Sequence, residues 1–467
     1  MTRKIPAVLF IGLVLFFLIS CGGDTGTDTS GIPTPGNPGE PPSGGKPGNP
    51  PDGGGFGGGN SSSSVEYKAA VSITEAGEYN GQTYASSSTD ECALIISSAG
   101  NVSVSDMTVT KSGSSNGGDS CNFYGLNAAV LVKDGSNAVI TDGKVTSNAS
   151  GANGIFSYGG NGGKNGAKGD GTTVTVTDTV ITTTGDGSGG IMTTGGGITK
   201  AKNLTVKTSG RSSAAIRTDR GGATVTVEGG TYSTSGLGSP AIYSTADITV
   251  SGANLISTQS EGVCIEGKNS INLINCNMTA SNTNMNGNAT FLDTIMIYQS
   301  MSGDADSGTS SFTMTGGKLT SKNGHVFHVT NTNAAINLSG VEIVNEDKSG
   351  FLLSVCDDGW SGAKNIATFN AHSQELNGTV LVGNGSTLTL NLEDGSAFTG
   401  CISGAITSAK GKTVSSSVGQ VNVKIDDSSS WTLTADTAIS SFTGDESRIV
   451  LNGHKLTVNG TVLTGTN

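Results

Sequence analysis

Charged residues are scarce in this chain. Asp, Glu, Lys and Arg together make up 13% of its 467 residues, and the net charge of −12 is spread thinly. No cluster of Lys and Arg forms the basic stripe that nucleic-acid-binding proteins carry, so no nucleic-acid partner is expected. The acidity is interpreted as a contribution to solubility rather than as a signal for a partner.

Helix-forming runs are also rare. Gly contributes 73 residues, and Thr, Ser, Asn and Val are abundant. This composition is typical of an all-β chain with many turns. The length alone would allow two or three domains, but the composition favours one continuous β architecture.

An apolar run lies near the N-terminus, at residues 6–19, directly after Arg3 and Lys4. A membrane-spanning helix needs about 20 apolar residues, so this run is too short to span a bilayer. Basic residues followed by a short apolar run are typical of an export signal.

The four residues Leu18–Cys21 follow that run. They resemble the lipobox of bacterial lipoproteins, in which the cysteine receives a diacylglyceride and becomes the mature N-terminus. The resemblance implies a lipoprotein signal peptide at 1–21, lipidation of Cys21, and attachment to a membrane of the bacterial cell envelope or surface.

Residues 22–64 consist mainly of Gly, Pro, Ser, Asp and Asn, with Phe56 as the only large apolar residue. Such a segment cannot bury enough apolar surface to offset the entropy cost of ordering it. We therefore expect a disordered tether that holds a folded body, residues 65–467, away from the membrane.

The body contains six cysteines, an even number that permits disulfides in an exported chain. Small buried thiols within a β core are an equally good interpretation. The spacings fit no zinc motif. The six are Cys92, Cys121, Cys264, Cys276, Cys356 and Cys401.

A phrase of alternating β-branched residues recurs along the body, with short steps of about 24 residues. That period is the length of one coil of a parallel β-solenoid with three short strands, and longer steps indicate inserted loops. We expect a single parallel β-helix of about 12 to 13 coils. The equivalent positions are predicted to be Val104, Ile140, Val176, Ala201, Val227, Val250, Ile274, Met314 and Leu338.

A second phrase supplies another strand of each coil, with a central apolar residue that points inward. These inward residues are Ile191, Ile216, Ile242, Ile265 and Ile297. The residues that follow them should form one outward column, which consists of Met192, Arg217, Tyr243, Glu266 and Tyr298.

This outward column predicts a glycan-binding strip. Tyr243 and Tyr298 offer flat rings to sugars, while Arg217 and Glu266 offer directional hydrogen bonds and could be bridged through Tyr243. A solvated face whose large residues stack only for stability is the alternative.

The segment RTDRGG supplies Arg217, Asp219 and Arg220. A lyase would use an arginine as base beside carboxylates that hold Ca²⁺, but a local salt bridge explains the same residues. The loop at 302–308 contains Asp304 and Asp306 and lacks a downstream bidentate Glu, so calcium is disfavoured and no cofactor is expected. The four histidines show no Ser-His-Asp arrangement.

The coil phrases, among them SSAAIRTDRGG from Ser212 and GSPAIYSTADI from Gly238, resemble the right-handed parallel β-helix superfamily of pectate lyases, polygalacturonases and bacterial surface adhesins. They are similar to exported β-helix proteins of that superfamily with no assigned reaction. The Gly-His-Gly and Arg-Ile-Lys motifs of the polygalacturonases are missing, so that chemistry is not expected.

The sequence therefore predicts a lipid-anchored surface protein, an adhesin or carbohydrate-binding module rather than an enzyme. Its partners would be a membrane, through the lipid, and a glycan or a cell-surface molecule. A polysaccharide lyase or related carbohydrate-active enzyme is the alternative, and a structural spacer is a third.

Overall fold

The computed structural model describes residues 65–285, 287–360 and 365–463. The predicted signal peptide, the lipidation site at Cys21 and the tether at 22–64 lie outside these residues. Within the described residues, no helix is both long and apolar enough to cross a membrane.

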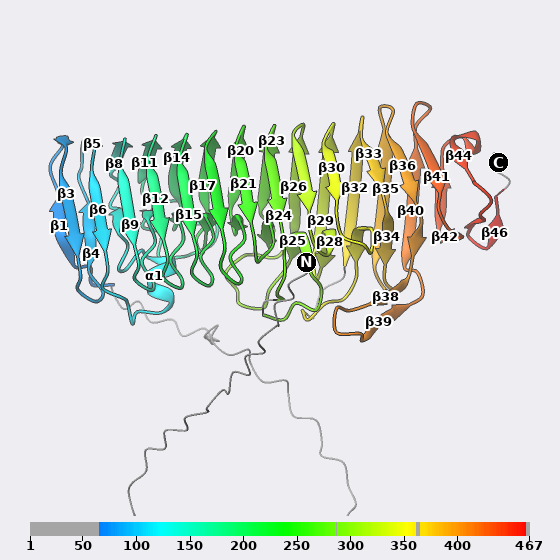
Figure 1. Cartoon of the computed structure of the whole chain (residues 1–467), viewed down its shortest axis with the longest axis horizontal. Coiled ribbons are helices and arrows are strands. Elements are labelled where there is room, and N and C mark those ends of the chain that lie inside the picture. Colours follow the sequence, from blue (N-terminus) through cyan, green and yellow to red (C-terminus); the bar gives the residue numbers. More distant parts are fainter. Residues whose placement is uncertain (1–64, 286, 361–364, 464–467) are drawn as a thin grey trace, which may run out of the picture. The chain divides into compact units, whose positions relative to one another are not determined.

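The body is a parallel β-helix, as predicted (Figure 1). Each coil contributes one strand to each of three sheets, and almost every strand pairs in parallel with its counterpart in the next coil. Sheet A has 13 strands and sheet B has 14, in agreement with the predicted coil number.

Sheet A consists of β1 (Ala69–Ile73), β4 (Cys92–Ile96), β7 (Val130–Val132), β10 (Ile155–Tyr158), β13 (Ile191–Thr194), β16 (Ile216–Thr218), β19 (Ile242–Ser244), β22 (Val263–Glu266), β25 (Asp293–Tyr298), β28 (His325–Thr330), β31 (Phe351–Val355), β34 (Thr379–Val382) and β37 (Ile402–Ser403). Sheet B consists of β2 (Gly77–Asn80), β5 (Asn101–Ser105), β8 (Asn137–Thr141), β11 (Thr173–Thr177), β14 (Gly197–Lys202), β17 (Ala223–Glu228), β20 (Asp247–Ser251), β23 (Ser270–Ile274), β26 (Thr309–Thr315), β29 (Asn333–Ser339), β32 (Ile366–His372), β35 (Thr387–Glu393), β40 (Gln420–Ile425) and β43 (Ser441–Thr443).

The third strand of each coil lies in sheet C and, in the later coils, in sheet D. Sheet C consists of β3 (Thr83–Ser86), β6 (Thr108–Lys111), β9 (Lys144–Ser147), β12 (Val180–Thr183), β15 (Thr205–Thr208), β18 (Thr231–Thr234), β21 (Asn254–Ser257), β24 (Asn277–Ala280), β27 (Lys318–Ser321) and β30 (Glu342–Asn345). Sheet D consists of β33 (Glu375–Asn377), β36 (Ala397–Gly400), β41 (Ser430–Leu433) and β44 (Ile449–Val450).

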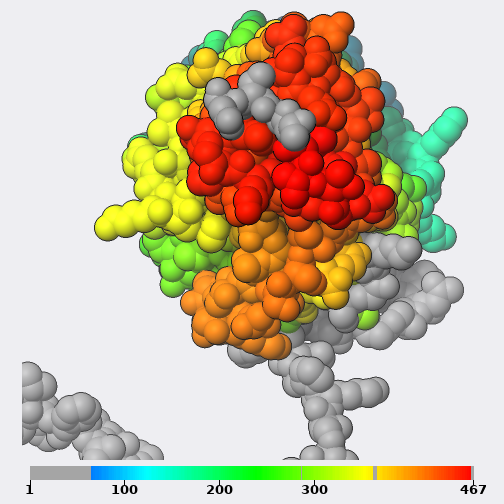
Figure 2. Space-filling model, turned by 90° about the vertical axis from the view of Figure 1, so that its right-hand side faces the viewer, coloured from blue at the N-terminus to red at the C-terminus, as the bar shows by residue number. Residues whose placement is uncertain are grey.

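The remaining elements are short. A hairpin of β38 (Ala405–Thr407) and β39 (Thr413–Ser416) projects from the coils (Figures 1 and 2). One helix, α1 (Asp119–Phe123), lies in an inserted loop, and η1 (Glu446–Arg448) lies near the C-terminal end. The last strands are β42 (Thr437–Ile439), β45 (Leu456–Val458) and β46 (Thr461–Val462).

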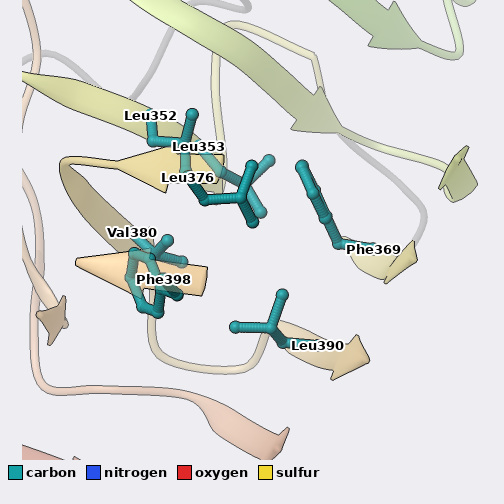
Figure 3. A pocket seen from close by; sticks show the side chains of 7 residues that line it. All are labelled: Leu352, Leu353, Phe369, Leu376, Val380, Leu390 and Phe398. Carbon is teal, nitrogen blue, oxygen red and sulfur yellow. The ribbon is translucent and has the colours of Figure 1, made fainter. Parts of the chain in front are cut away.

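The core is a continuous stack of inward side chains. Equivalent positions in neighbouring coils pair directly, as Val104 does with Ile140 and Ile140 with Val176. In the later coils leucine and phenylalanine side chains from sheets A, B and D point toward one another and leave no room for a water molecule (Figure 3). Coils that cannot bury these residues alone do so by stacking.

The corner between sheets B and C requires a left-handed backbone. Successive coils place Asp106, Asp142, Asp178 and Asn203 there, with φ values of 50°, 52°, 48° and 54°. Asn and Asp tolerate this conformation better than most residues, and Gly takes the position in other coils. Asp, Asn and Gly therefore supply the left-handed turns between these strands.

One predicted equivalence is wrong. Val250 pairs with Leu273, and Leu273 pairs with Met314, so Ile274 is not the inward residue of its coil. Leu273 is fully buried, whereas Ile274 is half-buried on the outer side. The segment NLIN contains two adjacent apolar residues, and the repeat alone did not distinguish them.

The six described cysteines are free thiols, and five of them are buried. Cys264 lies on the outer side of sheet A, whereas Cys276 belongs to the core. Of the two interpretations that the sequence allowed, the structure supports buried thiols.

The register at β23 is testable by paired substitutions. Leu273→Ala removes a fully buried side chain and should lower the free energy of unfolding by about 2–5 kcal/mol. Ile274→Ala, the matched control, should cost less than about 1 kcal/mol because the side chain stays partly in water. Urea unfolding followed by circular dichroism measures both, and equal costs would contradict this register.

Candidate functional site

Inserted loops gather at the ends of the sheet A strands. They include 112–127 with α1, 159–172, 299–308 and the segment of the β38–β39 hairpin. Figure 1 shows α1 and this hairpin on the same side of the coils. These loops cover the outer face of sheet A, and the predicted site residues lie on that face.

The predicted outward column is only partly correct. Met192 pairs with Arg217, and Arg217 pairs with Tyr243, but Tyr243 pairs with Cys264. Glu266 and Tyr298 pair with each other in the next outward column, two residues further along their strands. The predicted column is wrong at this point because β22 has two inward residues, Val263 and Ile265. The prediction aligned Ile242 with Ile265, whereas Ile242 pairs with Val263.

The two columns nevertheless meet at Glu266. The hydroxyl of Tyr243 donates to Glu266 Oε2 at 2.5 Å, and the hydroxyl of Tyr298 donates to the same oxygen at 3.2 Å. The other carboxylate oxygen accepts from the hydroxyl groups of Ser300 and Ser302. Glu266 is only 1% exposed, so this buried carboxylate is satisfied by hydroxyl donors from β19, β25 and the following loop.

Both tyrosines remain protonated in this setting. Burial and the charge of Glu266 raise the pKa of Tyr243 and of Tyr298 well above the usual value. Their hydroxyl groups therefore act as donors, and the two rings are held in place by one carboxylate.

Arg217 joins this group from the neighbouring coil. Its guanidinium lies over the Tyr243 ring, 5.7 Å from the centroid, and Nη2 lies 2.9 Å from Asp219 Oδ2. Nη1 donates to Ser212 O at 3.1 Å and to Asn122 Oδ1, in α1, at 3.3 Å. The predicted bridge from Arg217 to Glu266 through Tyr243 is therefore present.

Asp219 lies behind the arginine, with its side chain 5% exposed. Burial raises the pKa of Asp219 to about 7, although the Arg217 charge opposes the shift. The Asp219 carboxyl group therefore changes its protonation state near neutral pH.

Arg220 points to a different partner. It forms an ion pair with Asp304 and lies over the Phe123 ring, 4.3 Å from the centroid. Asp306 is paired with Lys268 at 2.9 Å. The two aspartates of the 302–308 loop are thus each neutralised by a separate cation, and the described residues contain no group of three or more His, Cys, Asp or Glu that could hold a metal ion.

A pocket of about 210 Å³ opens beside these residues. Both tyrosine rings and the Arg217 guanidinium contribute to its wall, together with small residues from the preceding turn. The lining residues are Ser212, Ala214, Arg217, Gly238, Pro240, Tyr243 and Tyr298. Arg217 is the only charged member of that lining.

A second polar cluster on the same face was missed by the sequence analysis. Ser354 Oγ lies 2.6 Å from Nδ1 of both His325 and His328, and His328 Nε2 lies 3.3 Å from Asp358 Oδ2. Phe291 packs against both imidazole rings. The spacing of the two histidines in β28 was the available signal, but the serine and the aspartate come from the next coil.

This cluster contains a Ser-His-Asp contact, yet Ser354 and His328 are fully buried. Burial lowers the pKa of His325 to about 3, so its ring is neutral. Asp358 also accepts a hydrogen bond from the Thr290 main chain at 2.5 Å. The cluster therefore joins the loop residues Thr290 and Asp358 to His328 of sheet A through hydrogen-bond and ion-pair contacts.

No family model, curated protein or solved structure matches this chain. The resemblance stated from the sequence is thus supported at the level of the parallel β-helix fold.

Asp219 makes the stability of the body depend on pH. Its folded pKa of about 7 lies above the ordinary value of 3.8, so its contribution is favourable at low pH and is lost as the pH rises from about 4 through 7. The free energy of unfolding should therefore fall with pH in this window by up to about 1.4 kcal/mol per pH unit, and Asp219→Asn should remove that dependence. Unfolding midpoints measured between pH 4 and 8 test this effect.

Asp306→Asn is the matched control. Its pairing with Lys268 lowers the pKa of Asp306, so its contribution is constant between about pH 4 and 8 and is lost only at more acidic pH; the substitution should leave the pH slope between about pH 4 and 8 unchanged. If the free energy of unfolding of Asp219→Asn varied with pH as in the wild type, the raised pKa of Asp219 would be contradicted.

Proposed function

We propose that this protein binds glycans through the pocket beside Tyr243 and is displayed on a bacterial surface by a lipid at Cys21. The observation that carries the proposal is the pair of tyrosine rings from β19 and β25, two coils apart, which border a pocket and are fixed by one buried carboxylate from the coil between them. Rigid aromatic rings bind ligands at a low entropy cost.

The pocket chemistry favours a sugar ring. Tyrosine faces and the ring of Pro240 are apolar surfaces for the C–H groups of a pyranose, while Arg217 donates directional hydrogen bonds to hydroxyl oxygens. Pockets that hold a drug-sized ligand measure about 300–1,000 Å³, so a volume of about 210 Å³ suits one sugar unit of a longer glycan.

The N-terminal segment supports display at a surface. A lipid on Cys21 and the Gly- and Pro-rich segment at 22–64 would hold the β-helix clear of the membrane, where it can meet an extended polymer. An adhesin needs this arrangement, whereas a protein of the cell interior does not.

Removing either ring should weaken glycan binding. Tyr243→Ala and Tyr298→Ala each delete one face of the pocket, and we expect each to lower affinity about tenfold or more, corresponding to about 1.4 kcal/mol. Titration calorimetry with a glycan that binds the wild type measures the loss.

Tyr79→Ala is the matched control, because Tyr79 is a half-buried tyrosine of the first coil and does not line this pocket. Its affinity should equal that of the wild type. Wild-type affinity in Tyr243→Ala and Tyr298→Ala, with the fold intact, would reject the pocket.

One observation favours a second candidate, a polysaccharide lyase or related carbohydrate-active enzyme. Burial raises the pKa of Asp219 to about 7, where a carboxyl group can accept and release a proton during catalysis. Turnover of an acidic polysaccharide that is lost in Arg217→Ala and in Asp219→Asn would establish it.

We expect binding without turnover, because Asp219 lies behind Arg217 and does not line the pocket. If the protein neither binds nor cleaves any glycan, the third alternative from the sequence, a structural spacer, is the better description.

A further inference from the structure

Lys111 occupies an unusual place in the β-helix. It is the last residue of β6 and points inward, and it is fully buried. Its counterparts in the neighbouring coils have small hydroxyl side chains, namely Ser86, Ser147, Thr183 and Thr208. A lysine at this position brings an amine into a space that other coils fill with a hydroxyl group.

The amine lies beside a buried asparagine. Lys111 Nζ donates to Ser88 O at 2.7 Å and also to Gly113 O. Asn127 Nδ2 donates to the same Gly113 O at 2.9 Å, and Asn127 is fully buried. Because both nitrogens share one acceptor, the amine and the side-chain amide are close neighbours.

The surroundings favour attack by the amine. Burial lowers the pKa of Lys111, which increases the fraction of neutral, nucleophilic amine. The main-chain N–H of Glu91 donates to Asn127 Oδ1 at 3.2 Å and so polarises the amide carbonyl. The negative charge of Glu91 opposes this shift of the Lys111 pKa without cancelling it, and its carboxylate accepts a hydrogen bond from Ser86.

We propose that Lys111 and Asn127 react to form an intramolecular amide bond. Lys111 Nζ attacks Asn127 Cγ, the Nζ–Cγ bond forms, and the Cγ–Nδ2 bond breaks. One proton passes from Nζ to Nδ2 through the Glu91 carboxylate, and the amide nitrogen leaves as ammonia. No oxidant or reductant is required.

The bond would close the inserted loop at 112–126 covalently. This loop contains α1, whose Asn122 accepts a hydrogen bond from Arg217 and whose Phe123 contacts Arg220. The cross-link would therefore hold the loop that contacts Arg217 and Arg220 against the coils, independently of whether the site binds glycans.

Mass spectrometry of the full chain tests the bond. After reduction, a protease that cleaves at Asp119 separates Lys111 from Asn127 in an unmodified chain. We expect the peptide that contains Lys111 and the peptide that contains Asn127 to remain joined. Their combined mass should be lower by one ammonia than the sum of the two peptide masses. Asn-Gly steps such as Asn116–Gly117 also lose ammonia by cyclisation, so joining of the pieces is the criterion.

Lys111→Met and Asn127→Ala should each give two separate pieces. Asn153→Ala is the matched control, because Asn153 is a buried asparagine of the next coil whose amide donates to Cys121 O; its pieces should stay joined. Glu91→Gln should leave the pieces separate if Glu91 carries the proton. If the wild type gave two separate peptides of unmodified mass, the proposal would be overturned. That result does not depend on whether any variant folds.

Discussion

Parallel main-chain hydrogen bonds between successive coils fix where the side chains of this molecule point. Each strand pairs with its counterpart one coil away, so a residue that points inward in one coil places its partners inward as well. The ladder buries a continuous apolar stack and leaves the outer faces of the sheets for other uses. The candidate site lies where inserted loops add to one of these outer faces.

Sheet A is the face that receives such additions. The inserted loops begin or end at its strands, and they close over charged and aromatic residues that would otherwise be solvated. Glu266 and Asp219 are both buried on this face. Glu266 accepts hydrogen bonds from hydroxyl groups of neighbouring coils and of the following loop, whereas Asp219 pairs with Arg217 of its own coil. Burial both orders the tyrosine rings and shifts the proton equilibrium of Asp219.

The sequence was sufficient for the fold because the repeat is strict in its inward residues. It also singled out Arg217, Tyr243 and Tyr298 as candidate site residues, and the structure places these three around one pocket. It was insufficient at Ile274, where either of two adjacent apolar residues could be the inward one, and in β22, where either of two inward residues could align with Ile242.

Contacts made by inserted loops were beyond the reach of the sequence. The repeat does not place a loop residue, so the partnership of Arg220 with Asp304 and of Arg217 with Asn122 could not be derived. The same limit applies to His328, whose partners Ser354 and Asp358 follow one coil later.

A glycan array probed with the purified protein, followed by product analysis of each hit, tests the central claim most directly. The account predicts that a defined class of glycan binds and that incubation yields no new reducing ends or unsaturated products. Cleavage of the bound glycans would contradict the assignment as a binding protein, and the absence of any bound glycan would contradict the proposed function of the Tyr243 pocket.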